Sequence, residues 1–169
     1  MKLPNRLRLF LLARVRAVMA SRPPDFIVGH AADPYLHRWR VFPRNALGNI
    51  YLHRFFRDDD DRALHDHPYH NLSIVLEHGY YEHLSHGWEC ERAPFRYPGW
   101  VGARRANTPH RVVTMDGKPP VSIFLHGPRV RAWGFHCLKG WVPWQVFHGM
   151  NNTKDPNDSG GHQSGKGCG

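Results

Sequence analysis

Hydrophobic residues from Phe26 to Phe147 occur in short runs rich in Val, Ile, Phe, Tyr and Trp, which Gly and Pro residues separate. No stretch of this region keeps the 3.6-residue period of a helix, and such runs between turn residues are typical of an all-β sandwich or barrel. About ten strands are predicted, which is enough for a double-sheet jelly roll. They are expected at 38–42, 48–57, 63–67, 72–76, 80–84, 95–97, 99–103, 110–115, 121–126 and 133–138.

The N-terminus has a different pattern. Leu3, Leu7, Phe10, Leu11 and Val18 have spacings close to a helical stripe, and arginines occupy the positions between them. This predicts a short basic amphipathic helix within 1–22, which is expected to pack on its own domain rather than to lie on a membrane. The two prolines at 23 and 24 end the helix, because proline lacks the backbone donor and restricts the residue before it.

Three segments are therefore expected: the helix at 1–22, one β-barrel domain at 23–150, and a disordered tail at 151–169. A chain of 169 residues with 41% hydrophobic residues can fill one core. The tail contains no large apolar residue, so it cannot bury enough surface to offset the entropy of ordering.

The balance of charges favours anionic partners, since 23 Lys and Arg residues stand against 14 Asp and Glu residues, a formal net charge of +9. The arginines are spread along the chain and do not form one run with interleaved aromatic residues, so a small anionic molecule is expected rather than nucleic acid. The apolar stretch 9–13 ends at Arg14 after five residues. It is too short for an export signal or a membrane span, and no membrane partner is expected.

Three cysteines, Cys90, Cys137 and Cys168, are an odd number and form no C-x-x-C pair. Neither a disulfide framework nor a zinc ribbon is indicated, and a reducing, cytoplasmic setting is expected.

The sequence His65-Asp66-His67 is the first candidate for chemistry. On a strand, alternate side chains point to the same face, so the two imidazoles would project side by side. Imidazole binds Fe, Zn, Ni, Cu or Mn, so the pair indicates a metal without identifying it. With 14 histidines in the chain, an H-x-H pair can also arise by chance.

The segment 65–82 resembles the first motif of the cupin superfamily, in which H-x-H is followed by three or four residues, a glutamate, six residues and a glycine. Gly79 stands at the expected glycine, whereas Asn71 and Leu72 stand at the two expected positions of the glutamate. The segment 97–112, from Pro98-Gly99 to His110, resembles the second cupin motif, and His110 matches the family's last ligand. The resemblance thus implies a three-histidine site of His65, His67 and His110.

The closing segment is similar to that of uncharacterised bacterial and phage cupins. It contains His126-Gly127-Pro128-Arg129 and the tryptophans Trp133, Trp141 and Trp144, which are expected to seal one end of the barrel. Together these likenesses imply a cupin-type double-stranded β-helix, a jelly-roll barrel that commonly pairs into a homodimer through its edge strands.

Other residues are candidates for a site around the metal. Glu82 and Tyr80 share one face of a predicted strand and are candidate proton-handling, catalytic groups. Arg62, Arg104 and Arg105 are candidate anchors for an acidic substrate, because guanidinium binds carboxylate in a fork. The acidic run 58–61 precedes the H-x-H strand, so one of its carboxylates is a candidate to orient a ligating imidazole.

The leading hypothesis is a cytoplasmic cupin that holds one divalent metal ion, with iron expected first and then zinc, manganese or nickel, and binds a small anionic molecule. Three imidazoles leave coordination positions open, as dioxygenase-like oxidoreductase chemistry requires. Two alternatives remain. One is a non-catalytic module that binds or senses a small ligand, and the other is a metal-independent isomerase or epimerase that uses a cavity histidine and tyrosine.

Overall fold

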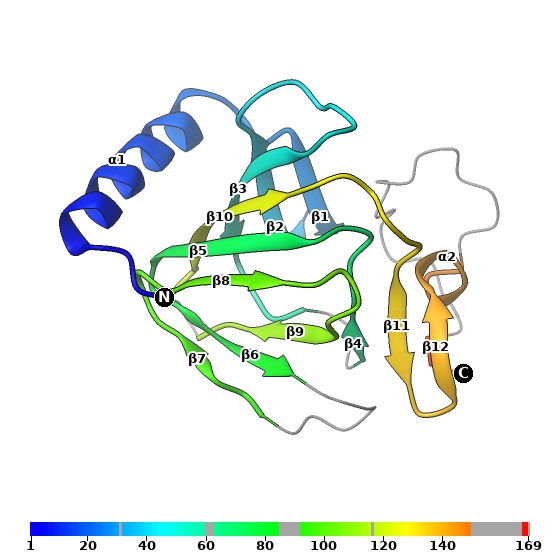
Figure 1. Ribbon diagram of the computed structural model, residues 1–169. Coiled ribbons are helices and arrows are strands. Elements are labelled where there is room, and N and C mark those ends of the chain that lie inside the picture. The colour runs from blue at the N-terminus through cyan, green and yellow to red at the C-terminus, as the bar shows by residue number, and fades with distance from the viewer. Residues whose placement is uncertain (31, 60–62, 85–91, 116, 150–166, 169) are drawn as a thin grey trace.

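The structure is a computed structural model that describes residues 1–30, 32–59, 63–84, 92–115, 117–149 and 167–168 of the chain (Figure 1). Two antiparallel six-stranded sheets and an N-terminal helix account for most of this part. The predicted all-β fold with a short N-terminal helix is confirmed. No helix in the described residues has the length and apolar character needed to cross a membrane.

The first sheet has the strand order β1-β2-β3-β10-β5-β8 and the second has the order β12-β11-β4-β9-β6-β7. Several neighbouring strands, such as β3 and β10 or β4 and β11, come from distant parts of the sequence, which is the arrangement of a jelly roll. The strands are β1 (Phe26–His30), β2 (Asp33–Arg40), β3 (Asn49–Phe55), β4 (Leu64–His65), β5 (Asn71–Glu77), β6 (Tyr80–Leu84), β7 (Phe95–Arg96), β8 (Val101–Arg104), β9 (His110–Val113), β10 (Val121–His126), β11 (Gly134–Cys137) and β12 (Gly140–Pro143).

Each of the ten predicted strands overlaps an observed one. The prediction missed β1 and began β2 five residues late, and it also missed β12. Both missed strands lie at the end of a sheet. An edge strand needs no continuous apolar face, because only one of its sides is paired and its side chains face solvent in part, so its sequence pattern is weak.

Helix α1 (Asn5–Ser21) covers the outer face of the first sheet (Figure 1). Leu12 and Val15 are its buried residues, and they pack on Trp39, Leu52 and Leu76. Leu11 and Val18 of the predicted stripe also pack against this cluster, so the prediction was right for these two residues and wrong for Leu7 and Phe10.

Two members of that stripe, Leu7 and Phe10, have exposed fractions of 45% and 61%. Hydrophobic residues occur on more than one face of α1, and packing on the sheet selects the face that carries Leu12.

A second apolar cluster lies between the two sheets. Leu36, Phe55 and Val75 from the first sheet meet Tyr80 and Val112 from the second. On β5, Val75 therefore faces inward whereas its neighbour Leu76 faces α1, as the alternation of side chains along a strand requires. This alternation defines the inner face on which the candidate site lies.

The turn between β5 and β6 depends on Gly79, which has φ +119°. A Cβ atom at this position would lie 2.7 Å from the backbone oxygen of Arg96, so glycine is the residue that fits. The turn allows β6 to cross to the second sheet, where it pairs with β9.

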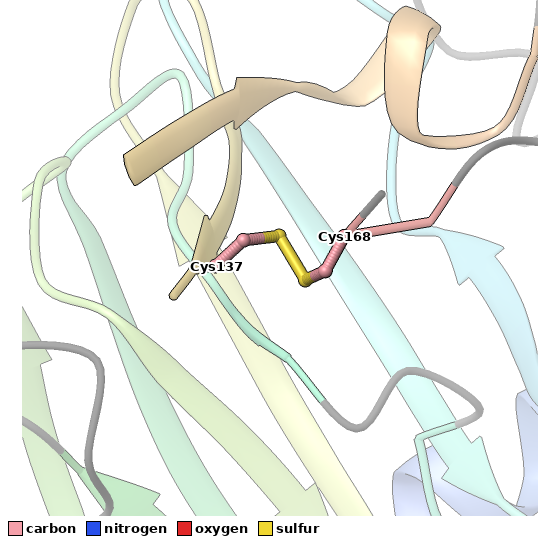
Figure 2. Close-up of a disulfide and its surroundings, with 2 residues drawn as sticks. All are labelled: Cys137 and Cys168. Carbon is pink, nitrogen blue, oxygen red and sulfur yellow. A yellow bond between two sulfur atoms is a disulfide. The ribbon is translucent and has the colours of Figure 1, made fainter. Parts of the chain in front are cut away.

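A disulfide joins Cys137, the last residue of β11, to Cys168 (Figure 2). The expectation that the cysteines are unpaired was wrong, because their spacing of 31 residues in sequence gives no local signal of their proximity. Cys90 and most of the predicted disordered tail lie outside the described residues.

We expect the disulfide to stabilise the C-terminal hairpin, because it closes a long loop and restricts the unfolded chain. Replacing Cys168 by Ser should lower the free energy of unfolding by roughly 2–4 kcal/mol, measured by urea denaturation without reductant. Cys137→Ser should lower the free energy of unfolding by the same amount, because either substitution removes the same bond. Equal stability of wild type and Cys168→Ser would contradict the pairing.

Candidate metal centre

Three histidines meet on the inner face of the second sheet. β4 pairs with β9 so that His65 lies opposite His110, and His67 follows two residues after His65. Nε2 of His67 and Nε2 of His110 are 2.8 Å apart. The ligand atoms of all three rings lie within 4.8 Å of one another. The structure thus brings together the three histidines that the sequence predicts as ligands.

Asp66, between the two histidines of the H-x-H pair, is fully buried. It accepts hydrogen bonds from the backbone N–H of Gly134 at 2.9 Å and from the side chains of His136 and Trp141 at 3.1 Å each, and it pairs with Arg131. A buried carboxylate is tolerated only when it has such partners. These contacts fix β4 against the β11–β12 hairpin and thereby fix both neighbouring histidines.

Carboxylates also hold two of the three ligand rings through Nδ1. Oε1 of Glu82 lies 2.9 Å from Nδ1 of His110, and Oδ2 of Asp59 lies 3.0 Å from Nδ1 of His65. The Glu82–His110 contact is a hydrogen bond, and an imidazole that donates its Nδ1 proton to a carboxylate presents the lone pair of Nε2 to a metal. Asp59, from the acidic run, lies within ion-pair distance of His65, and its role in orienting this ring stays a prediction.

Burial keeps the rings in the form that binds metal. It lowers the pKa of His67 well below the ordinary value, and the charges of neighbouring histidines lower it further. Burial also lowers the pKa of His110 from 6.5 to about 4, against the opposing effect of Glu82. Both rings are therefore neutral at pH 7, and a neutral imidazole is the ligand form.

Glu82, one of the two predicted catalytic residues, is fully buried and pairs with Arg96 and Arg104 as well as with His110. Burial by itself raises the pKa of the Glu82 carboxyl, but the hydrogen bond from His110 and the charge of Arg104 outweigh it and lower the pKa from 4.5 to about 2. The ionised carboxylate is suited to orient His110 rather than to carry a proton. These contacts favour a positioning role for Glu82.

Tyr80, the other predicted catalytic residue, has an exposed fraction of 3% and packs with Phe55 and Val75 in the apolar cluster between the sheets. Burial raises the pKa of its hydroxyl. In the part of the chain that the structure describes, no hydrogen bond or ring contact joins Tyr80 to the three histidines. Its catalytic role stays a prediction.

The predicted substrate anchors differ in position. Arg62 lies outside the described residues, and Arg105 is exposed in the turn that leads to β9. Arg104, the third candidate, is buried and paired with Glu82. Arg38 on β2, which the sequence did not single out, contacts His53.

Sequence reasoning did not identify Asp66 or Arg38 as parts of this region, and it considered Arg104 only as a substrate anchor. A charged residue within a strand is ordinarily a surface residue, so Asp66 between two candidate ligands gives no sign of its buried partners. The signal for Arg38 was its position inside a predicted strand, where a buried arginine requires an acidic or aromatic partner.

The donor set fits a divalent metal ion. Three imidazoles converge, the two rings held by carboxylates present Nε2, and such nitrogen ligands suit Fe, Zn, Ni and Cu. Asn71 stands at an expected position of the glutamate ligand, and its Oδ1 faces Arg104. Three protein ligands leave coordination positions for a small molecule or water.

Comparison with known proteins identifies the fold. No protein-family model matches the sequence, and no curated protein matches it. Solved structures do match. The Fe(II) form of HppE superposes with a TM-score of 0.51 at 14% identity, over 63% of this chain and 57% of that chain. A conserved protein with a double-stranded β-helix domain from Klebsiella pneumoniae gives a TM-score of 0.50 at 11% identity, over 66% of this chain and 91% of that chain.

The fold is the cupin double-stranded β-helix. A sugar phosphate isomerase from a cupin superfamily of Silicibacter pomeroyi also matches, with a TM-score of 0.48 at 14% identity over 64% of this chain and 74% of that chain. The chain described here spans little more than half of the length of HppE. At these identities the likeness establishes the fold of the chain, and its chemistry has to be argued from its own residues.

Replacing Asp66 by Ala should be strongly destabilising, because it leaves Arg131, His136 and Trp141 without their acceptor. We expect the free energy of unfolding to fall by roughly 3–5 kcal/mol, measured by urea denaturation. Hydrogen exchange should show faster opening of β11 and β12.

The matched control is Glu77→Gln. This carboxylate pairs with Arg16, whose side chain has an exposed fraction of 60%, and an exposed pair contributes at most about 1 kcal/mol. An equally small effect of both substitutions would contradict the role of Asp66 in holding β4.

Proposed function

We propose that this cupin binds one divalent metal ion through His65, His67 and His110 and uses it to bind and transform a small anionic molecule. The observation that carries the proposal is the convergence of three imidazoles, two of which have a buried or nearly buried carboxylate within 3.0 Å of Nδ1. Histidines that cluster on a surface without binding a metal do not require a carboxylate at the other ring nitrogen.

The charges around the histidines support an anionic ligand. The imidazoles are neutral and do not offset the charge of a dication. Glu82 offsets only one of the two arginines that contact it, and Asp59 contributes one further negative charge beside His65. The site with a bound dication therefore carries a net positive charge, which attracts a carboxylate or phosphate.

Iron is the first candidate for the ion, followed by zinc, manganese and nickel. All of these accept imidazole ligands, and HppE, which shares the fold, is an Fe(II) protein. A bound ion would act as a Lewis acid and, if redox-active, would support oxygen-dependent chemistry. The protein's own contribution is to orient the rings through Asp59 and Glu82 and to fix β4 through Asp66.

Elemental analysis tests the metal site directly. Wild-type protein purified without chelator or nickel resin should contain about one metal ion per chain, and His67→Ala should contain none, because two imidazoles on their own bind an ion weakly. His78→Asn is the control, since His78 lies in a turn with φ 58° that asparagine also adopts.

Absence of metal from wild type, even after anaerobic reconstitution with Fe(II), Mn(II) and Zn(II), would overturn the proposal. Activity that survives a chelator would instead favour a metal-independent isomerase. Ligand binding to the metal-loaded protein without any turnover would favour a sensing module.

Asp59→Asn should weaken metal binding about 10–100-fold, because the amide no longer fixes the His65 ring as a charged acceptor does. The dissociation constant for Zn(II), measured by competition with a chromophoric chelator, checks this. Asp33→Asn is the control, since the Asp33 side chain has an exposed fraction of 76% and pairs with Arg57. Equal affinities of wild type and Asp59→Asn would exclude the orienting role.

A further inference from the structure

A second polar group of residues lies beside the metal centre on the inner face of the first sheet. It consists of Arg38, Tyr51, His53, Tyr69 and His126, named here the Arg38 cluster. Nε of Arg38 donates to Nε2 of His53 at 3.0 Å, and the guanidinium carbon of Arg38 lies 4.9 Å from the centre of the Tyr51 ring.

The register of the sheet places Arg38 on the inner face. Arg38 is paired with His53 across β2 and β3, whereas the next residue, Trp39, is paired with Leu52. Trp39 and Leu52 pack under α1. Because side chains alternate along a strand, Arg38 and His53 project to the opposite side, toward the histidines.

Aromatic contacts connect the Arg38 cluster with the metal centre. His53 stacks on Phe124 with 5.2 Å between ring centres, and Phe124 lies 5.8 Å from His67. Tyr69 stacks on His126 at 3.8 Å and lies 5.8 Å from His67. After burial and the neighbouring histidines, the charges of Arg104 and Arg38 also lower the pKa of His67. Arg38 is thus close enough for its charge to act on a metal ligand.

Among the residues that the structure describes, the charge of Arg38 has no acidic partner. Its contacts are the His53 ring nitrogen and the Tyr51 face, and among the described residues no carboxylate lies within ion-pair distance of it. Burial first, and then the charge of Arg38, lower the pKa of His53 far enough that the ring is neutral. Arg104 differs, because Glu82 pairs with it.

Asn71 supplies an independent sign of a missing partner on the same face. Its exposed fraction is 5%, and its Oδ1 accepts a hydrogen bond from Arg104 at 3.5 Å. Its Nδ2 is buried and has no hydrogen-bond partner in the described part of the chain. A buried donor without an acceptor costs roughly 1–3 kcal/mol, so a ligand that supplies an acceptor atom to Nδ2 of Asn71 would be stabilised. Asn71 is paired with His126 of the Arg38 cluster across β5 and β10.

We propose that Arg38 anchors the anionic group, a carboxylate or a phosphate, of a small ligand that reaches the metal centre, and that Asn71 donates to the same ligand. The terminal nitrogens of a guanidinium match the oxygens of either group in a fork. Tyr51 and His53 orient the guanidinium through the stacking contact and the Nε hydrogen bond. This inference rests on the proposed function and assigns the substrate anchor to Arg38 in place of Arg62 or Arg105.

Isothermal titration with inorganic phosphate and with acetate, on protein loaded with Zn(II), tests the anchor. Arg38→Ala should weaken binding of the preferred anion at least about tenfold, and Arg38→Lys should weaken it less, because it keeps the charge but loses the fork. Asn71→Leu should also weaken binding. Arg105→Ala is the matched control and should bind as wild type does. The anion whose affinity falls when Arg38 is replaced identifies the class of the ligand as a phosphate or a carboxylate.

The zinc content of each variant separates this inference from the proposed function. We expect one zinc per chain in Arg38→Ala and Arg38→Lys, which also reports that the site has folded. Anion binding that is lost in Arg105→Ala and kept in both Arg38 variants would overturn the assignment of the anchor while the metal site stands. If the wild-type protein binds no metal but still binds the anion, and Arg38→Ala abolishes that binding, the proposed function is overturned and the anion site stands.

Discussion

The buried carboxylate of Asp66 is the interaction on which the site depends. It lies between two ligand histidines, directly after the two-residue strand β4 (Leu64–His65). Its carboxylate oxygens accept from the β11–β12 hairpin and from the segment before it. Because the two flanking histidines converge with His110 whereas Asp66 contacts the hairpin, the same three residues present ligands and a fixed attachment.

A second carboxylate, Glu82, organises the opposite wall. It joins β6 to β9 through His110 and to β8 through Arg104. Removing an ion from water is costly unless several partners replace the water, and Glu82 has three. The arrangement fixes the tautomer of His110 and holds a positive charge close to the ligand rings, so orientation and electrostatics come from the same contacts.

The interior is divided into an apolar part and a polar part. Leu36, Phe55 and Val75 fill one part with well-packed hydrophobic side chains, which stabilises the two sheets against each other. The three histidines and Arg38 occupy the other part, where His110 is buried and His65, His67 and Arg38 are half-buried. Strands β2 and β3 contribute to both parts, because inward-facing residues recur at every second position along a strand. On β2 the apolar Leu36 is followed two residues later by Arg38, and on β3 His53 is followed by the apolar Phe55.

The sequence by itself determined the class of fold, the ten main strands, the helix and the three histidines, because alternation, turn glycines and the H-x-H spacing are local properties of the chain. It did not determine which face of α1 is buried, since Leu7 and Leu12 are equally apolar and only the sheet distinguishes them. It gave no sign of the Cys137–Cys168 disulfide or of the partners of Asp66, which are separated from it by 65 to 75 residues. Those pairings, and the position of Arg38 beside the ligands, were decided by tertiary structure, because which distant charges meet depends on the order of strands in the sheets.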